Sequence, residues 1–432
     1  MSPIAVVDGI RTPFCKSGGA IKDIGADDLG AIVTRELLAR TGIAPEAIDE
    51  VIFGCVCQPA KAANIARVIA LKAGLPQSTI AQTVHRNCAS GIQAVTTAAL
   101  EIQAGRSDLI IAGGAESMSH VPLMFGPGMT GLFMSLAKAK TPGQKLAALT
   151  KFRPRFLNPI IGLKLGLTDP VCELNMGQTA EVLAREFGVT REEQDAFALE
   201  SHQKAASAQN EGRHGDEVMP IVGQPRYDTV HEKDDGIRQS QTMEALAKLK
   251  PYFDRYAGTV TVGNACPVTD GAAALILCSE AKAKELEDSH GLKPIGWIHD
   301  WAYAALDGRR MGLGPVYAAS KLLDQTGGSM RDYDMVELNE AFAAQVIANE
   351  RAFASKQFAR EHLGRDDAVG EIDHDKLNVN GGAIALGHPV GATGTRLILT
   401  MLREMKRRGA QKSLATLCVG GGQGAAVSLE AA

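Results

Sequence analysis

The chain repeats part of itself, and this repeat limits the folds that are open to it. Segment 37–51 contains LLARTG and DEV, and segment 322–336 contains LLDQTG and DMV at the same spacing, 285 residues later. Further on, CASG from Cys88 falls opposite HPVG from His388, at an offset of 300 residues. Self-similarity at a fixed offset indicates duplicated structural units. We therefore expect one body of two similar halves, with Cys88 and His388 at equivalent positions.

The apolar pattern predicts that strands and helices alternate along each half. Short apolar runs predict strands, and apolar residues at helical spacing, followed by glycine, predict helices. The strands are expected at 4–7, 50–57 and 109–112, and the helices at 28–41, 62–74 and 92–103. Such alternation is typical of an α/β fold with a parallel or mixed sheet covered by helices. The second copy has gained 15 residues (300 minus 285), which we place in the polar stretch 351–376.

The part between the two halves breaks this alternation. Residues 117–168 contain no Asp or Glu, and their glycines and prolines predict loops. The same stretch carries seven cationic side chains: Lys138, Lys140, Lys145, Lys151, Arg153, Arg155 and Lys164. Such a surface can bind a phosphorylated cofactor, contact an anionic membrane surface, or simply be solvated. Beyond it, 181–208 is expected to be helical with a break near Gly188, because Thr190 and Glu193 form a capping box.

Composition excludes several classes of function. The formal net charge of -4 gives no general attraction to nucleic acid, and the cationic stretch offers few aromatic side chains for stacking bases. The eight cysteines show no CxxC pair and no zinc-type spacing, so we expect free thiols and no metal site. No apolar run approaches the ~18 residues that span a bilayer, and no signal region opens the chain. A cytoplasmic protein is expected.

Cys88 is the first candidate for a reactive side chain. It lies where an extended run, 80–84, gives way to the predicted helix 92–103, and the small residues Ser90 and Gly91 suit the start of that helix. A thiol at a helix N-terminus faces unpaired backbone N–H groups, so we expect its pKa to fall below the free value of about 8.5. Cys88 is therefore a candidate nucleophile. The alternative is a buried cysteine that acts as a small apolar side chain.

Two glycine-rich stretches hold further reactive side chains. Residues 378–396, NVNGGAIALGHPVGATGTR, surround His388, and residues 417–424, LCVGGGQG, contain Cys418. Neither is a phosphate-binding loop, because the Gly-Lys-Ser/Thr ending is missing. Glycines beside a reactive side chain instead let backbone N–H groups approach a developing oxyanion. Two thiols and an imidazole fit a two-step acyl transfer, in which a thiolate attacks a thioester and a second base removes a proton from carbon.

These blocks make the chain resemble the thiolases, a family of acetyl-CoA acyltransferases. The likeness covers residues 4–430 and rests on the blocks around Cys88, His388 and Cys418, together with NEAF from Asn339. It implies an α/β fold of five layers, αβαβα, made of two similar halves and an inserted loop domain that binds coenzyme A. The implied divisions are the N-terminal half, 1–116 and 257–288, the loop domain, 117–256, and the C-terminal half, 289–432.

The resemblance implies a role for each candidate. Cys88 is the nucleophile that carries the acyl group, and His388 activates it and helps to polarise the thioester oxygen. Cys418 is the acid or base that protonates the departing acetyl-CoA carbanion or deprotonates the incoming acetyl-CoA. Asn339 holds a water in one oxyanion hole, to which His388 also belongs. The backbone N–H groups of Cys88 and Gly420 form the other.

Coenzyme A is expected as substrate and product, with no permanently bound cofactor. Positions that match the family's contacts to coenzyme A and substrate are Met176, Arg238, Leu249, Phe253, Cys266, Ala341 and Phe342. The family suggests a homodimer or homotetramer. The stretch 351–376 and SHQKAA at 201–206 also resemble the thiolase subunit of fatty-acid oxidation complexes. This likeness implies a hydratase/dehydrogenase subunit as a further partner, and the cationic stretch suggests a peripheral membrane contact.

Several positions depart from the commonest family pattern. Asn175 replaces the His of many short-chain thiolases, Cys266 replaces a frequent Ser, and His85 replaces a frequent Asn. Oxidation-complex subunits usually carry His where this chain has Asn339. We expect a degradative or reversible 3-ketoacyl-CoA thiolase of fatty-acid β-oxidation, acting through an acyl-Cys88 intermediate. The alternatives are a biosynthetic enzyme that condenses two acetyl-CoA into acetoacetyl-CoA, and a non-catalytic lipid-binding or scaffold protein.

Overall fold

A large mixed sheet runs through the protein, whose computed structural model describes residues 2–432. In this range the sheet has ten strands, nine of them in the order β12-β13-β14-β11-β1-β10-β5-β3-β4, with the short β2 paired to β10. The strands of the first half are β1 (Ile4–Arg11), β2 (Cys15–Lys16), β3 (Glu50–Gly54), β4 (Ile80–Val84), β5 (Leu109–Ser117) and β10 (Thr269–Cys278). Those of the second half are β11 (Gly296–Ala305), β12 (Met335–Leu338), β13 (Lys412–Val419) and β14 (Gln423–Glu430).

The two halves pair their strands in the same order. In the first half β1–β10 and β10–β5 are antiparallel and β5–β3 is parallel, and in the second β11–β14, β14–β13 and β13–β12 repeat this sequence. β1 and β11 join the halves over three residue pairs. The predicted repeat is therefore confirmed. The added stretch 351–376 leads to Leu377, which pairs with Val336 of β12 as β4 pairs with β3.

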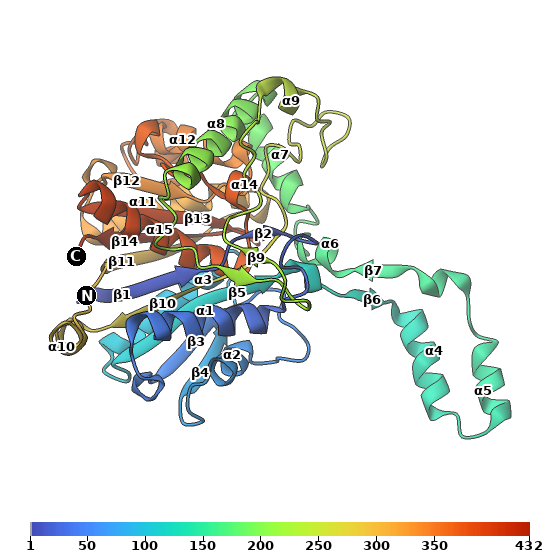
Figure 1. The fold of residues 1–432 in the computed structure, drawn as a ribbon. Helices are drawn as coiled ribbons and strands as arrows, with labels where there is room; N and C mark the ends of the chain where they lie inside the picture. Colours follow the sequence, from blue (N-terminus) through green and yellow to red (C-terminus); the bar gives the residue numbers. More distant parts are fainter. Residues whose placement is uncertain (1) are drawn as a thin grey trace.

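Helices cover both outer faces of the sheet and fill the space between the halves, as Figure 1 shows. α1, α2 and α10 pack on the outer face of the first half, α3 and α15 lie between the halves, and α11 and α12 cover the second half. The five-layer α/β fold implied by the resemblance is thus confirmed. The helices of the body are α1 (Ala26–Thr41), α2 (Ile65–Ala73), α3 (Ser90–Gln103), α7 (Met176–Glu186), α8 (Arg191–Asn210), α9 (Met243–Ala247), α10 (Glu280–His290), α11 (Gly314–Thr326), α12 (Ala343–Ala354), α13 (Lys356–Phe358), α14 (Ala383–Leu386) and α15 (Val390–Arg408).

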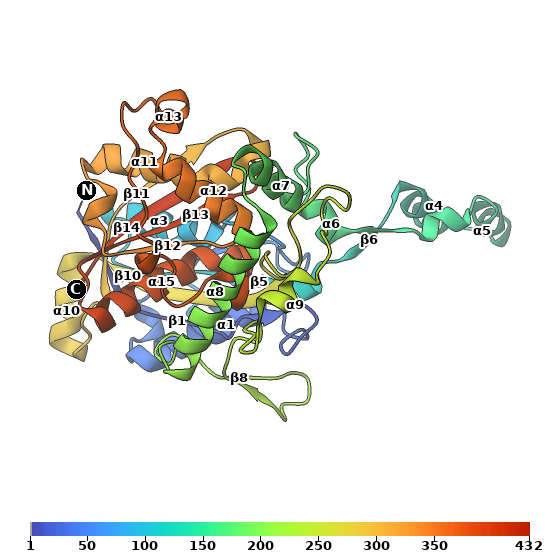
Figure 2. The same cartoon turned by 90° about the horizontal axis from the view of Figure 1, so that it is seen from above.

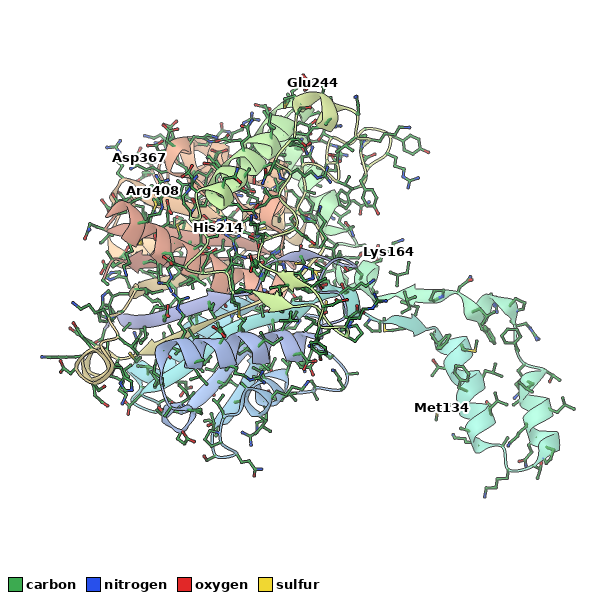
Figure 3. The ribbon with its side chains drawn as sticks, in the orientation of Figure 1. Met134, Lys164, His214, Glu244, Asp367 and Arg408 are labelled. Carbon is green, nitrogen blue, oxygen red and sulfur yellow. The ribbon has the colours of Figure 1, made fainter. Side chains whose placement is uncertain are left out.

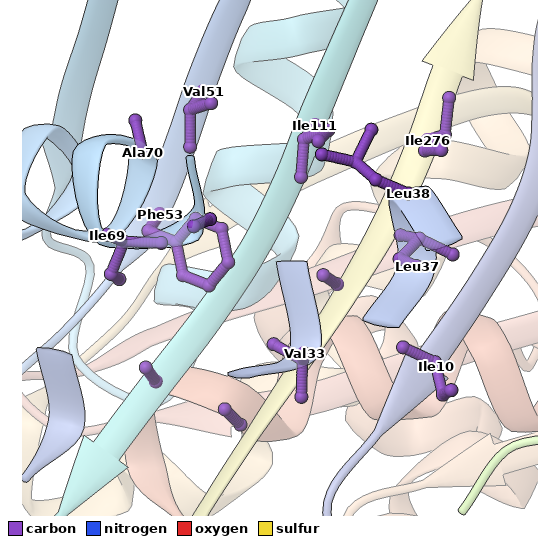
Figure 4. Close-up of a cluster of buried hydrophobic side chains, with 14 of the residues drawn as sticks. Ile10, Val33, Leu37, Leu38, Val51, Phe53, Ile69, Ala70, Ile111 and Ile276 are labelled. Atoms are coloured by element: carbon purple, nitrogen blue, oxygen red, sulfur yellow. The ribbon is translucent and has the colours of Figure 1, made fainter. Parts of the chain in front are cut away.

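The core of the first half shows why these layers form. Val33 and Leu37 lie on one face of α1 and point at the sheet, where Ile111 points back at this helix and Phe53 lies beside α2 (Figure 4). Side chains alternate along a strand, so the neighbouring Ile52 of β3 points to the opposite face and packs in the layer of α3 and α15. A strand buried on both faces reads as a continuous apolar run, and this explains the runs that predicted the strands.

An arm projects from the body between β5 and α7 (Figures 1 and 2). The expectation that 117–168 forms loops is wrong, because two of its prolines, Pro127 and Pro142, start helices instead of preventing them. They occupy the first positions of α4 and α5, where the missing N–H of proline costs nothing. No helix within 2–432 combines the length and the apolar character needed to cross a bilayer. The elements of the arm are β6 (Leu123–Phe125), α4 (Pro127–Lys138), α5 (Pro142–Leu149), β7 (Pro159–Ile161) and α6 (Gly162–Gly166).

The helical stretch predicted over 181–208 is divided between α7 and α8. The chain turns at Gly188, whose φ of +61° is a left-handed conformation that glycine adopts without strain. The predicted capping box is present. The hydroxyl of Thr190 accepts from the backbone N–H of Glu193 at 3.2 Å, and the Glu193 carboxylate accepts from the backbone N–H of Thr190 at 2.7 Å. The predicted break is confirmed, and the two helices lead the chain from the arm to the second half.

Candidate active site

Cys88 lies in the turn between β4 and α3, where the sequence placed it. The backbone N–H groups of Cys88 itself and of Gly420 hydrogen-bond to its sulfur and favour the thiolate. Burial of the sulfur has the larger effect and raises the pKa of Cys88 above its ordinary value, with a smaller contribution from the negative charge of Glu116. The expectation of a lowered pKa is therefore wrong, because the loss of hydration outweighs the N–H groups.

Glycines let the N-termini of α3 and α15 approach each other. A Cβ at Gly91 would lie 2.6 Å from the backbone N of Thr395, and a Cβ at Gly394 would lie 2.5 Å from the backbone N of Ile92. A side chain at either position would force the two helices apart. The glycines that follow His388 on α15 therefore serve helix packing, whereas the sequence pattern indicated contacts to an oxyanion. Their effect is to bring the two halves together at the reactive residues.

His388 precedes α15 and is 6% exposed. Its Nδ1 lies 2.7 Å from Oγ1 of Thr393, whose hydroxyl donates to the carbonyl of Pro389 at 3.0 Å. Because that hydroxyl hydrogen is already used, we assign the ring proton to Nδ1, which leaves the lone pair on Nε2. Nε2 is buried and has no hydrogen-bond partner within residues 2–432. Burial, together with the charge of Arg396, lowers the pKa of His388 to about 3, so the imidazole is a neutral base.

Cys418 lies near the end of β13 and is 1% exposed. Burial raises its pKa far above the ordinary value, and negative charge on Cys88 and Cys266 raises it further. The three sulfurs thus lie close enough to affect one another, and Cys88 and Cys418 are both thiols at rest. An apolar cluster around Cys418 contains most of the side chains expected to contact coenzyme A and substrate: Met176, Phe253, Cys266, Ala341 and Phe342.

Asn339 follows β12 and donates its backbone N–H to the carbonyl of Thr416 at 3.0 Å. Both polar atoms of its side chain are buried, and neither has a hydrogen-bond partner in the described range 2–432. An unpaired buried amide costs about 1–3 kcal/mol, so the position suits a water or a substrate oxygen. Its neighbour Glu340 is fully paired by contrast, accepting from Oγ of Ser201 at 2.6 Å and from Nδ2 of Asn378 at 2.8 Å.

The start of α7 positions two of the side chains in this cluster. The side chain of Asn175, one of the departures from the family pattern, accepts from the backbone N–H of Gly177 at 3.0 Å and caps the helix. The ring of Phe253 lies directly on Gly177, where any Cβ would collide with it. Met176 is the first residue of α7, so its place depends on this cap. Asn175 therefore has a structural role in which it accepts a helix N–H group.

Two expected contacts to coenzyme A lie apart from the cluster around the second thiol. Arg238 donates its backbone N–H to Nδ1 of His202 at 3.2 Å. Leu249 accepts through its carbonyl from Nη2 of Arg191 at 3.0 Å. Both residues therefore lie beside α8, with Arg238 next to His202 and Leu249 next to Arg191. Burial, and then the charge of Arg238, lower the pKa of His202 to about 4, so the ring is neutral there.

Sequence reasoning missed Glu116, the second-last residue of β5. Its buried carboxylate accepts from the backbone N–H groups of Cys57 and Gly391, each at 2.9 Å, and so connects the first half to the loop that carries His388. Burial raises its pKa although these N–H groups favour the charge. The available signal was an acidic residue directly after the apolar run 109–115. Among residues 2–432, no group of three His, Cys, Asp or Glu side chains is arranged to hold a metal ion.

Known proteins resemble this chain over its whole length. The thiolase N-terminal domain matches residues 4–281, and the thiolase C-terminal domain matches 292–431. The chain is 46% identical to a 3-ketoacyl-CoA thiolase of Yersinia enterocolitica over 428 residues, which are 99% of this chain and 96% of that protein. An acetyl-CoA acetyltransferase of Bacillus anthracis superposes with a TM-score of 0.86 at 37% identity, covering 100% of this chain and 99% of that one. Human mitochondrial 3-ketoacyl-CoA thiolase in complex with CoA superposes with a TM-score of 0.85 at 35% identity, covering 100% and 98%.

Proposed function

The chain belongs to the thiolase family, and on this premise we propose that it transfers the acyl group of a 3-ketoacyl-CoA to coenzyme A and releases acetyl-CoA. The observation that carries the proposal is the meeting of two unlike thiols. Backbone N–H groups point at the sulfur of Cys88, as a nucleophile requires, whereas Cys418 is buried among apolar groups and keeps its proton, as an acid requires. The relatives named 3-ketoacyl-CoA thiolase favour a degradative role in fatty-acid β-oxidation.

The reaction begins when Nε2 of His388 takes the proton of Cys88. The sulfur attacks the 3-keto carbon, the bond between C2 and C3 breaks, and its electron pair stays with the acetyl-CoA fragment. Cys418 gives its proton to that carbon, so acetyl-CoA leaves and an acyl-Cys88 thioester remains. The thiol of coenzyme A then passes its proton to Cys418 and attacks the acyl group. Cys88 leaves as a thiolate and recovers its proton from His388.

Two sites are proposed to stabilise the oxygens that become negative. The backbone N–H groups of Cys88 and Gly420 face the reacting sulfur, and an acyl oxygen bonded beside that sulfur lies within their reach. On the other side, the unpaired amide of Asn339 suits a water that, with His388, polarises the thioester oxygen of the acetyl-CoA fragment. Asn339 is buried and its backbone is fixed by β13, so this amide is positioned before substrate arrives.

The walls around the second thiol are proposed to hold the pantetheine and acyl parts of the substrate. They are apolar and aromatic, as a site for an acyl chain requires. We assign the binding of coenzyme A to the loop domain, 117–256, together with side chains of the two thiolase halves between which it is inserted, 1–116 with 257–288 and 289–432. The proposed contacts are Met176, Arg238, Leu249, Phe253, Cys266, Ala341 and Phe342.

The two thiols are distinguished by separate substitutions. Cys88→Ala is expected to abolish both thiolysis and the burst of acyl-enzyme, since the nucleophile is gone. Cys418→Ala is expected to accept an acyl group from acyl-CoA onto Cys88 but to lose carbon–carbon bond formation and cleavage by more than about 100-fold. Mass spectrometry of the acylated protein and a thiolysis assay measure the two steps. A Cys418→Ala enzyme that condenses normally would show that the thiols are wrongly assigned.

A biosynthetic role is the second candidate, and two observations favour it. The chain superposes on an acetyl-CoA acetyltransferase, and it carries Asn339 where oxidation-complex subunits usually carry His. Thiolysis rates over short-, medium- and long-chain 3-ketoacyl-CoA distinguish the two roles. We expect activity on medium and long chains, whereas activity on acetoacetyl-CoA alone would establish the biosynthetic enzyme. Absence of all turnover in a protein that still binds acyl-CoA would favour a lipid-binding scaffold.

The arm is proposed to contact an anionic membrane surface. Its cationic side chains form no salt bridge within residues 2–432. More than half of the large exposed apolar side chains in that range lie between Leu123 and Leu165. Figure 3 shows Met134 far out on the arm and Lys164 near its base. Basic and apolar groups presented together favour the headgroup region of a bilayer over a nucleotide, which offers no apolar surface of this extent.

A second copy of the chain is proposed to pair along β4. Within 2–432, this strand is the edge strand of the sheet in the first half. Ile80 of β4 is 61% exposed, and Leu100 of the adjoining α3 is 49% exposed. An open, apolar strand edge is unfavourable in water unless another strand covers it. Light scattering distinguishes the proposed homodimer from a homotetramer.

Two further proposals need measurements of their own. Copurification tests whether a hydratase/dehydrogenase subunit is bound, and cell fractionation tests the proposed cytoplasmic location.

A further inference from the structure

A turn of three glycines carries one of the two N–H groups that face the nucleophile. Gly420, Gly421 and Gly422 join β13 to β14, and the residues on either side of them, Val419 and Gln423, form the last pair of the two strands. Gly421 and Gly422 have φ values of +90° and +79°. Glycine has the widest conformational freedom of any residue, so a turn made of glycine alone does not fix the direction of its peptide groups. Something outside the turn must hold it.

The two residues before the nucleophile contact both ends of this turn. Nδ2 of Asn87 donates to the carbonyl oxygen of Gly420 at 2.7 Å. Nη1 of Arg86 donates to Oε1 of Gln423 at 3.0 Å, and its guanidinium lies 4.2 Å from the centre of the Tyr303 ring. Asn87 and Arg86 belong to the first half, whereas the turn belongs to the second. The contact therefore fixes the nucleophile and the turn relative to each other.

The backbone of Asn87 is itself in a rarely used conformation. Its φ is +44°, in the left-handed region where Asn is among the few non-glycine residues that are tolerated. Its backbone N–H lies 3.4 Å from Nδ1 of His85. Left-handed backbone at a reactive site is retained when the surroundings require it. In this conformation the Asn87 amide donates to the turn.

Gly420 is consequently held at both of its peptide groups. The peptide before it continues β13, and the peptide after it accepts from Asn87. On the open side, a Cβ at Gly420 would lie 3.2 Å from the sulfur of Met176, so little room is left for the turn to move. The N–H that remains free of these contacts is the one that hydrogen-bonds to the sulfur of Cys88.

We propose that Asn87 is a positioning residue, which holds the carbonyl of Gly420 so that the Gly420 N–H stays directed at the Cys88 sulfur and at the acyl oxygen bound beside it. The inference rests on the proposed function, because it gives this N–H a part in acyl transfer. It adds to that function a residue that touches neither substrate nor the reacting atoms. Asn87 acts through Gly420 alone.

Asn87→Gly is the sharpest test, because glycine keeps the left-handed backbone and removes only the amide. We expect kcat for thiolysis to fall roughly 10-fold, the effect of losing one oriented hydrogen bond, with KM for coenzyme A within about twofold. Asn87→Asp keeps the size of the side chain but cannot donate, and it should lose at least as much activity. The matched control is Tyr227→Gly, at another left-handed position (φ +57°) on an exposed loop, which should leave kcat unchanged.

Alkylation of Cys88 by iodoacetamide without substrate reports the same contact directly. Removing the Asn87 amide should shift the pH dependence of alkylation to higher pH, because the Gly420 N–H no longer favours the thiolate. The titratable and charged groups that act on or adjoin Cys88 are unchanged by the substitution: Glu116, Cys266, Cys418, His85 and Arg86.

The outcomes separate this inference from the proposed function. An active wild-type enzyme whose Asn87→Gly variant keeps the wild-type kcat and alkylation profile overturns the positioning role. A wild-type protein that cleaves no 3-ketoacyl-CoA, but whose Cys88 alkylation still shifts in Asn87→Gly, overturns the proposed function and leaves the positioning role intact. If Asn87→Gly fails to fold, Asn87→Asp decides by the same kcat measurement.

Discussion

The pKa of Cys88 lies above its ordinary value although two backbone N–H groups point at its sulfur. The pKa of His388 lies far below its ordinary value, at about 3, for the related reason that burial disfavours the charged imidazolium. Neither group is therefore charged at neutral pH before substrate binds. In the proposed reaction, proton transfer between them therefore occurs during the attack, when the acyl oxygen in its proposed N–H site stabilises the developing charge.

This ground state predicts how Cys88 reacts with iodoacetamide. A raised thiol pKa means that the thiolate forms only as the pH rises, so the alkylation rate should climb through the alkaline range, with its midpoint above that of a free cysteine. The rate measured with substrate absent, corrected by the Cys88→Ala variant for the other thiols, checks this. A rate already at its plateau near neutral pH would indicate a resting thiolate–imidazolium pair and contradict the neutral pair described above.

At the scale of elements, the first turn of α7 decides where an aromatic wall of the site stands. Gly177 is the second residue of α7, and Gly177→Ala would place a Cβ inside the space of the Phe253 ring. We expect Phe253 to move and KM for coenzyme A to rise about 5–10-fold, since overpacking costs about 1–3 kcal/mol. Gly143 is likewise the second residue of its helix, α5, and has open space around it. Gly143→Ala is the matched control and should leave KM unchanged.

A rise in KM in both variants would indicate a general effect of alanine at the start of a helix. Unchanged kinetics in Gly177→Ala would show that Phe253 does not contribute to binding coenzyme A. The measurement is steady-state thiolysis at varied coenzyme A concentration, with the melting temperature as a check on folding.

The sequence predicted elements well where one physical signal was sufficient. The repeat between 37–51 and 322–336 gave two corresponding halves, and the capping box at Thr190 gave the break between α7 and α8. The helices of the arm were missed because a proline at the first position of a helix and a proline in a loop look the same in a sequence. The raised pKa of Cys88 was missed because burial depends on chain segments that are distant in sequence.

The sequence motifs predicted the candidate reactive residues, but not the residues that hold them in place. The motifs identified Cys88, His388 and Cys418, and the structure brings the two thiols close together and places α3 of the first half against α15, which His388 precedes. Glu116 and Asn87 were not singled out, since each acts through a backbone group that only the folded chain brings near. A carboxylate that accepts N–H groups and an amide that donates to a carbonyl carry no motif of their own.

At the scale of the whole molecule, the proposed membrane contact of the arm can be tested separately from the chemistry. Replacing Lys138, Lys140 and Lys145 by Glu should abolish sedimentation with anionic vesicles, because each lysine near such a surface contributes about 1 kcal/mol and three together change binding by more than about 100-fold. Thiolysis of a short, soluble substrate should be unchanged. The control is the same exchange at Lys282, Lys284 and Lys293, which lie on or just after α10 of the body.

Equal loss of sedimentation in both triple variants would show that the net charge of the protein, and not the position of the lysines on the arm, determines binding to the vesicles. Sedimentation that survives in the arm variant would show that the arm does not dock on the bilayer. Raising the salt concentration should weaken binding of the wild-type protein, since attraction between exposed charges is screened.

The matching strand order of the two halves has a consequence for how such a catalyst arose. The N-terminus of α3 and the N-terminus of α15 correspond in the two copies and touch through glycines at the centre of the molecule. A symmetric ancestor would have presented the same side chain twice at that contact. In the present chain one copy supplies a sulfur and the other an imidazole, so duplication would have allowed two identical positions to diverge into the proposed nucleophile and its proposed base.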